Sequence, residues 1–218
     1  PDNPGVFHCG DVMYDNSIFF ADVAQKKSGI LQKLNASAGK YILSTIHRDH
    51  NTDLPERLSA IFKAIVTIAS KEKIQCIIPL HPRTKKMLSK NLSSDLYQKI
   101  QNQPEIQIIG PVSFLDMINL EKNASMIMTD SGGVQKEAYF FKKPVIVLRP
   151  ETEWVEIVEQ GAGIISDAHE QNIIEAFQFF RSAQSISYSP IFGDGKAAEF
   201  IGQKMVDVFE NRPNRFQK

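Results

Sequence analysis

Residues 126–137, MIMTDSGGVQKE, combine the residue types and the spacing that can bind an anion. The short apolar run at their start predicts a buried strand, and Val134 and Ala138 recur at helical spacing after the glycine pair at 132–133. We therefore expect a strand, a tight turn and a helix N-terminus. Such a terminus carries free backbone N–H groups and the positive end of the helix dipole, and glycine lets an anion approach them closely. The stretch predicts a binding site for a phosphorylated ligand.

Polar residues also follow several other predicted strands directly. They are His47 and Arg48 after 41–45, His81 and Arg83 after 74–80, and Arg149 and Glu153 after 144–148. In an open α/β sheet, ligands bind outside the carboxyl ends of the strands, so we expect these side chains to share one crevice with the glycine turn. Fixed donors, bidentate guanidinium groups and imidazoles are the groups that bind a diphosphate.

Each of these features also has a purely structural interpretation. A lone Ser-Gly-Gly is usually a turn and a helix cap, and His81 could likewise cap the next helix. His47 with Arg48 could begin a solvated loop. Glu137, expected in the first helical turn, is favoured there by the dipole alone, or it accepts hydrogen bonds from ribose hydroxyls. Arg149 is harder to explain structurally, because a charge at the end of a central strand is costly to bury without a partner.

Predicted strands alternate with predicted helices along almost the whole chain. Strands are expected at 41–45, 74–80, 106–109, 125–129, 144–148 and 163–166. Helices are expected at 54–70, 82–90, 114–123, 133–141, 153–160, 170–182 and 197–211, and an amphipathic stretch at 18–34 precedes the first strand. Most of the strands are apolar on both faces. The sequence therefore predicts an α/β fold with a doubly wound, Rossmann-like parallel sheet of about six strands flanked by helices.

The composition narrows the class of protein. Lys+Arg and Asp+Glu number 25 each, so no net charge attracts nucleic acid or a membrane surface, and the hydrophobic share of 42% suits a compact domain. Cys76 lies in an apolar run, so we expect a buried free thiol and a reducing, cytoplasmic location. No apolar run approaches the roughly 18 residues of a membrane span. No Cys/His/Asp cluster has metal-ligand spacing, and we expect no metal and no cofactor.

Several separated motifs resemble those of the non-hydrolysing UDP-N-acetylglucosamine 2-epimerases. TDSGGVQKEA at 129–138 and KKPVIVLRPETEWVEIVEQGAG at 142–163 are similar to the C-terminal half of that family. STIHRDHN at 44–51 and PLHPRTKKML at 79–88 resemble its two upstream histidine motifs, and SPIFGDGKAAEFI at 189–201 resembles its closing loop and final helix. The motifs stand in the family's order and span nearly the whole chain, which makes the resemblance specific.

The resemblance implies one half of a two-domain glycosyltransferase-B-type architecture, in which two Rossmann-like domains clasp a sugar nucleotide. Residues 1–38 would form the interdomain connection and a leading helix, and residues 39–218 the UDP-binding domain. The family's N-terminal half would then be absent. The chain opens on Pro1 without a methionine, so we expect a segment of a longer protein. Its expected partners are UDP, a UDP-N-acetyl sugar and that missing half, and related enzymes are commonly dimers.

The resemblance also implies roles for single residues. Carried over motif by motif, the substrate-binding residues are Arg48, His81, Met117, Ser131, Gly132, Gly133, Glu137, Arg149 and Glu153. Residues 131–133 would bind the diphosphate, Glu137 the ribose and Met117 the uracil, while His47 is the expected catalytic residue. The family often has a second acidic residue where this chain has Lys136. We expect Lys136 to point to solvent, or alternatively to tune the charge near the phosphates.

The implied reaction interconverts UDP-N-acetylglucosamine and UDP-N-acetylmannosamine by anti elimination of UDP and its re-addition. It needs groups that stabilise the leaving diphosphate and a base that takes the C2 proton. The carboxylates resembling those bases belong to the absent half, so we expect the isolated chain to be inactive. A donor-binding domain of a UDP-sugar glycosyltransferase and a non-catalytic nucleotide-binding module remain as alternatives. The sugar, and a hydrolysing or non-hydrolysing outcome, are also left open.

Overall fold

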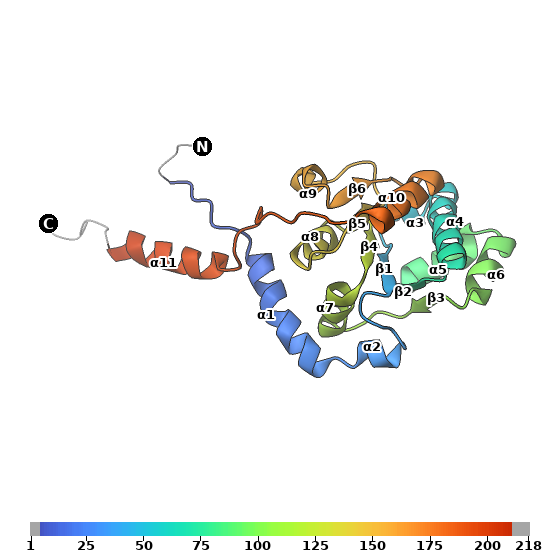
Figure 1. Cartoon of the computed structure of the whole chain (residues 1–218), viewed down its shortest axis with the longest axis horizontal. Coiled ribbons are helices and arrows are strands. Elements are labelled where there is room, and N and C mark those ends of the chain that lie inside the picture. Colours follow the sequence, from blue (N-terminus) through green and yellow to red (C-terminus); the bar gives the residue numbers. More distant parts are fainter. Residues whose placement is uncertain (1–4, 211–218) are drawn as a thin grey trace.

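The structure of the chain, a computed structural model, describes residues 5–210. A six-stranded sheet forms its centre, with helices on both sides (Figure 1). The strands are β1 (Tyr41–Thr45), β2 (Gln75–Pro79), β3 (Ile106–Ile109), β4 (Met126–Thr129), β5 (Val145–Val147) and β6 (Gly163–Ile165). All pairs are parallel, in the order β3-β2-β1-β4-β5-β6. The predicted doubly wound, Rossmann-like sheet is confirmed, and the topology reverses between β1 and β4.

Most helices agree with the predicted ones; the exceptions are two additional short helices and an earlier start of the first helix. They are α1 (Val12–Lys27), α2 (Ile30–Lys33), α3 (Asp49–Thr52), α4 (Pro55–Glu72), α5 (Pro82–Asn91), α6 (Ser94–Asn102), α7 (Phe114–Asn123), α8 (Gly132–Phe140), α9 (Val155–Glu159), α10 (Glu170–Ser182) and α11 (Ala197–Glu210). Helices α3 and α6 were not expected. The amphipathic stretch at 18–34 is α1 followed by α2, and α1 begins earlier than predicted because Asp11 caps it by accepting from the Met13 N–H at 2.8 Å. The end predicted for the last helix, residue 211, lies outside the described residues.

Two apolar cores cover the two faces of the sheet. Successive strand residues point to opposite faces, so neighbours in one strand belong to different cores. Ile42, Ile78, Met128 and Ile146 pack with α4, α5 and α10 on one face, and Leu43, Ile77, Ile127 and Val145 pack with α7, α8 and α9 on the other. Burying one such side chain contributes roughly 1.5–3 kcal/mol. Because apolar side chains occupy both faces, a polar site on this sheet has to lie beyond the strand ends.

The first and last described segments meet beside the sheet. Helix α11 extends away from the sheet next to the N-terminal segment (Figure 1), and the rings of Phe7 and Phe200 lie 6.5 Å apart. Gly10 and Gly193 touch where the segments cross, and both have positive φ. A Cβ added at Gly193 would lie 2.9 Å from the Gly10 Cα, so this crossing requires glycine. None of the helices between residues 5 and 210 is long and apolar enough to cross a membrane.

Candidate functional site

The carboxyl ends of adjacent strands bring most of the predicted site residues to one rim of the sheet. His81 follows β2, His47 follows β1, Ser131 follows β4 and Arg149 follows β5. These strands are neighbours in the parallel sheet, so their carboxyl ends share an edge. The structure thus places imidazoles, a glycine turn and a guanidinium group along one line, where open α/β sheets bind ligands.

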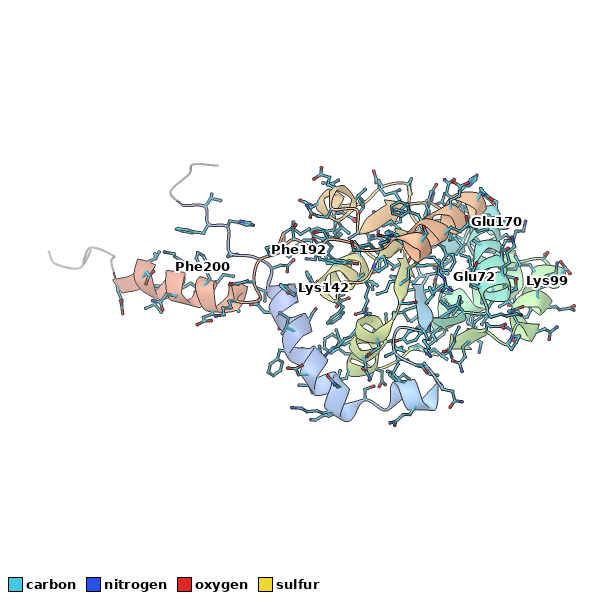
Figure 2. All side chains as sticks on the ribbon, viewed as in Figure 1. Glu72, Lys99, Lys142, Glu170, Phe192 and Phe200 are labelled. Carbon is cyan, nitrogen blue, oxygen red and sulfur yellow. The ribbon has the colours of Figure 1, made fainter. Side chains whose placement is uncertain are left out.

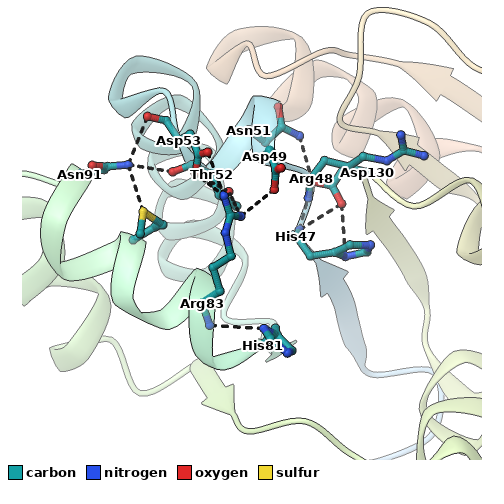
Figure 3. A network of polar contacts seen from close by, with 11 residues as sticks. His47, Arg48, Asp49, Asn51, Thr52, Asp53, His81, Arg83, Asn91 and Asp130 are labelled. Carbon is teal, nitrogen blue, oxygen red and sulfur yellow. Dashed lines mark hydrogen bonds and ion pairs between the residues drawn. The ribbon is translucent and has the colours of Figure 1, made fainter.

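The centre of the rim is organised by Asp130, which has no exposed surface. Its Oδ2 accepts hydrogen bonds from the backbone N–H groups of His47 and Arg48 at 3.1 and 3.0 Å, and from Nδ2 of Asn51 at 3.1 Å (Figure 3). Its Oδ1 lies 3.5 Å from Nδ1 of His47. Asp130 therefore positions the loop after β1 and orients the His47 ring. Asp130 was not among the predicted site residues, although a carboxylate directly after a buried strand indicates that hydrogen-bond donors surround it.

An apolar cleft of about 380 Å³ opens beside this centre. Its walls include three predicted site residues, His47, His81 and Met117, together with Phe114 and Val134. Apolar walls with a few polar groups are typical of sites that bind small molecules and cofactors. Val134 was expected only as a helix position. Its place in the wall follows from the glycine turn, which directs the first turn of α8 toward the cleft.

Several predicted ligand-binding groups also have structural roles. His81 caps α5 by accepting from the Arg83 N–H at 3.3 Å, and Ser131 caps α8 by accepting from the Val134 N–H at 3.5 Å. Arg83 was expected to share the crevice, but its side chain pairs with α3 instead. Its guanidinium group pairs with carboxylates at the start and end of α3, Asp49 at 2.7 Å and Asp53 at 2.8 Å (Figure 3). It therefore ties α5 to α3.

At the other end of the rim, Arg149 and Glu153 form a bidentate pair, with N–O distances of 2.8 and 2.9 Å. Arg149 holds the pKa of the Glu153 carboxyl below its usual range. The loop that carries them lies on the glycine turn, because Trp154 Nε1 donates to the Gly132 carbonyl at 2.8 Å. A Cβ at Gly132 would lie 3.3 Å from the Glu153 carboxylate. A diphosphate at this turn would compete with Glu153 for Arg149.

Glu137 lies deeper than expected. Helix α8 begins at Gly132, so Glu137 is in the second turn rather than the first, and the helix dipole alone does not explain it. Its neighbour on α7 is Glu121, which has no exposed surface. Burial raises the pKa of Glu137 to about 7. Hydrogen bonding to Glu121 and the nearby charge of Lys136 act in the opposite direction and lower this pKa. Burial, together with the Glu137 charge, raises the pKa of Glu121 well above its usual range.

Lys136 does not point to solvent, so that expectation is wrong. The residue is 9% exposed, its Nζ pairs with Asp11, and it lies 4.3 Å from the centre of the Trp154 ring. Phe192, in the segment between α10 and α11 (Figure 2), packs against the same tryptophan. The cation is thus enclosed between α8, the N-terminal segment and an aromatic wall, where its charge is matched by Asp11.

No group of three or more His, Cys, Asp or Glu side chains in the described part of the chain could hold a metal ion. Cys76 is buried and free, as predicted.

Comparison with known proteins decides the family. The model of the family described as UDP-N-acetylglucosamine 2-epimerase matches residues 2–206. This chain belongs to that family. A UDP-N-acetylglucosamine 2-epimerase homolog of Methanococcus maripaludis is 46% identical, with 96% of this chain and 56% of that protein covered. A UDP-2,3-diacetamido-2,3-dideoxy-D-glucuronate 2-epimerase of Pseudomonas aeruginosa is 36% identical, with 93% and 53% covered.

A solved structure shows the same relation in three dimensions. The crystal structure of the Methanocaldococcus jannaschii UDP-GlcNAc 2-epimerase in complex with UDP-GlcNAc and UDP matches with a TM-score of 0.81 at 35% identity. The match covers 92% of this chain and 54% of that one. The chain therefore spans about half the length of the family members it matches, and its fold is half of their glycosyltransferase-B-type architecture. The resemblance found in the motifs is confirmed.

Proposed function

We propose that this chain is the UDP-binding half of an enzyme that inverts C2 of a UDP-N-acetyl sugar, with UDP-N-acetylglucosamine and UDP-N-acetylmannosamine as the substrate pair. The observation that carries the proposal is the apolar cleft that lies next to a glycine turn on one rim of the sheet. Membership of the family and the nucleotides bound by the M. jannaschii relative support it.

We assign each part of the nucleotide to a different part of the rim. The cleft beside Met117 would take the uracil ring, because its walls are largely apolar. Glu137 would accept hydrogen bonds from the ribose hydroxyls. The N–H groups of Gly132 and Gly133 at the start of α8, together with the Ser131 hydroxyl, would bind the diphosphate. Arg149 would supply the countercharge once Glu153 releases it.

The chemistry assigned to this half is stabilisation of the leaving UDP. As the bond between C1 and oxygen breaks, charge develops on the diphosphate, next to the helix N-terminus and the guanidinium group. His47, oriented by Asp130, would donate a hydrogen bond there. The base that removes the C2 proton is assigned to the half of the relatives that this chain does not span. We therefore expect this chain alone to bind UDP and to leave the sugar unchanged.

The same missing half is the partner we assign to the projecting helix. Exposed apolar side chains of α11 and the N-terminal segment line one shared hollow and include Phe7, Phe200, Ile201, Met205, Val208 and Phe209. They lie together on a part of the molecule that extends away from the sheet (Figure 2). An apolar surface of this kind is expected to be covered by another folded unit.

Titration calorimetry with UDP tests the proposal that this chain binds the nucleotide. Wild type should bind, and Ser131→Ala and Glu137→Ala should each lose on the order of 1–3 kcal/mol of binding free energy, because each removes a polar contact at a partly dry site. Lys99→Ala, on the exposed face of α6, is the control that should bind normally. Unchanged affinity in both site variants would remove these residues from the nucleotide site.

Isotope exchange tests the assignment of the chemistry. Incubation of this chain with UDP-N-acetylglucosamine in deuterated water should leave C2 unlabelled. Labelling by this chain alone would refute the assignment of the C2 base to the half that the chain does not span. A protein that joins the chain to the missing half should label C2 without any acceptor sugar, which separates an epimerase from a glycosyltransferase. Because one relative is named for a diacetamido glucuronate nucleotide, that nucleotide should be tested beside UDP-N-acetylglucosamine.

A further inference from the structure

Glu121 is a buried carboxyl group without a conventional hydrogen-bond donor. The residue has no exposed surface, and among the described residues no N–H group or hydroxyl donates to either of its carboxyl oxygens. An ionised carboxylate in such a place would carry a large desolvation cost. Glu121 is therefore expected to hold a proton, and its own O–H then needs an acceptor.

Two elements that pack around Glu121 carry the titratable groups nearest to it, and one of these groups can accept that proton. From β1, the Tyr41 hydroxyl donates to the Leu120 carbonyl at 2.5 Å. From α8, Lys136 is paired with Asp11, whereas the Glu137 carboxyl lies close enough to Glu121 to accept a hydrogen bond from it, because α8 packs against α7. Two carboxyl groups can bond to each other only when one of them is protonated.

The pair lies directly behind the wall of the apolar cleft. Met117 precedes Glu121 by one turn of α7, and Val134 precedes Glu137 by one turn of α8. Met117 and Val134 both line the cleft. Because both helices start at the carboxyl edge of the sheet, the two glutamates lie one turn deeper than the ring that the cleft would hold.

We propose that Glu121 is a positioning residue: it keeps one proton, donates it to Glu137, and so holds Glu137 ionised with its remaining lone pairs facing the ribose hydroxyls. The inference rests on the proposed function, because it assigns Glu121 to the ribose contact of the same nucleotide site. Glu121 does not itself touch the nucleotide.

Nucleotide binding is then coupled to the release of a proton. Ribose hydroxyls donate to an ionised Glu137, so binding lowers the pKa of Glu137 from its value of about 7 and releases a proton near neutral pH. Affinity rises as the pH increases through that range. The Lys136 charge and the Glu121 donor both favour the ionised form, and burial opposes it.

The test compares Glu121→Gln, which keeps a donor, with Glu121→Leu, which removes it. The probe is UDP-N-acetylglucosamine, whose diphosphate is doubly esterified and has no proton to lose between about pH 6 and about pH 8. Affinity is measured by calorimetry across this range. Glu121→Gln should bind within about 2-fold of wild type. Glu121→Leu should bind about 10-fold more weakly at neutral pH, with the midpoint of its pH curve raised by about one unit, since one pKa unit corresponds to a factor of ten.

Two results would overturn the proposal. One is an unchanged midpoint in Glu121→Leu, and the other is an equal loss in Glu121→Gln and Glu121→Leu, which would mean that packing or charge, rather than a donated proton, matters. If a variant fails to fold, a measurement on the wild-type chain without ligand still tests the proposal. In a carbon-13 titration of the glutamate carboxyls of the wild-type chain, Glu121 should stay protonated after the exposed glutamates have ionised; ionisation together with them contradicts the proposal. If wild type does not bind the probe, the proposed function fails, while this titration still decides the state of the pair.

Discussion

Asp130, in the turn between β4 and α8, and Glu121, within α7, are both fully buried carboxyl groups, but their surroundings differ completely. Asp130 accepts hydrogen bonds from two backbone N–H groups and from the Asn51 amide. Glu121 receives none from a conventional donor. Equal burial therefore produces an anion fixed by donors in one place and a carboxyl that keeps its proton in the other.

The difference follows from where each residue lies in the fold. Asp130 comes at the end of a strand, where the neighbouring β1 has also ended and the N–H groups of its loop have no sheet partner. Glu121 lies within α7, where the backbone N–H groups are used by the helix itself. A strand end can supply donors to a buried carboxylate, while the interior of a helix cannot.

The largest effect is expected from removing Asp130, the carboxyl group that the donors surround. Asp130→Ala leaves the N–H groups of His47 and Arg48 and the Asn51 amide without their acceptor, so the free energy of unfolding should fall by about 3 kcal/mol or more. Urea denaturation measures this loss. Asp22→Ala is the control: this aspartate is 75% exposed and pairs with Lys122 at 4.0 Å, so its loss should stay below about 0.5 kcal/mol. Similar losses in the two variants would contradict the role given to Asp130.

A smaller effect is expected from converting one donor into an acceptor. Asn51 donates to Asp130 at 3.1 Å and to the Leu148 carbonyl at 2.8 Å, while its Oδ1 accepts from Arg57. Asn51→Asp keeps the contact with Arg57 but places its second carboxylate oxygen against two acceptors. The free energy of unfolding should fall by about 2 kcal/mol at neutral pH. The loss should shrink near pH ~4, where a protonated carboxyl can donate again. A loss that is independent of pH would mean that the amide matters for packing alone.

The chain should unfold less readily at neutral and higher pH when Glu137, the neighbour of Glu121, loses its charge. The pKa of Glu137 is about 7 in the folded chain, above the 4.5 of an unperturbed glutamate. The folded chain therefore binds more protons than the unfolded chain between these values, and stability falls as the pH rises. Glu137→Gln removes this dependence, so its advantage over wild type should grow by on the order of 1–3 kcal/mol from about pH 5 to about pH 8. Denaturation at both pH values measures it.

Glu56→Gln is the matched control for that measurement, since Glu56 is exposed at the start of α4. Its stability relative to wild type should stay nearly constant over the same range. Equal slopes in the two variants would show that Glu137 is not the source of the pH dependence.

The smallest effect is expected at Ser131, the residue after Asp130 in the turn. Ser131 caps α8 through a long contact of 3.5 Å, so Ser131→Ala should cost about 0.5–1 kcal/mol of stability. Thermal unfolding measures it. A loss as large as that of Asp130→Ala would mean that the Ser131 side chain supports more than the first turn of the helix.

Much of the fold and the position of the rim could be predicted, because the signals are local. Apolar runs such as the one before Asp130 mark strands that are buried on both faces, and a polar residue directly after such a run marks the strand end. The parallel order then brings His47, His81 and Arg149 to one edge without further information. Helix α3, with four residues, is too short to show a period.

The contacts that define the site chemically could not be predicted, because they join distant segments. Helical spacing indicates that Glu121 is on a buried face, but it does not say that Glu137 lies opposite. Lys136 looked like a surface residue because its partner, Asp11, is far away in the sequence. Periodicity indicates which side of an element is buried, whereas the identity of the opposing group depends on the packing of two elements.

The contact between Gly10 and Gly193 has a consequence for tolerated substitutions. Any side chain at residue 193 must push back the Gly10 backbone, and with it Asp11, which holds Lys136 beside Trp154. Trp154 in turn donates to the carbonyl of the glycine turn. Even an alanine at this remote crossing would therefore disturb the geometry of the phosphate end, so variation at residue 193 should be as restricted as variation within the turn itself.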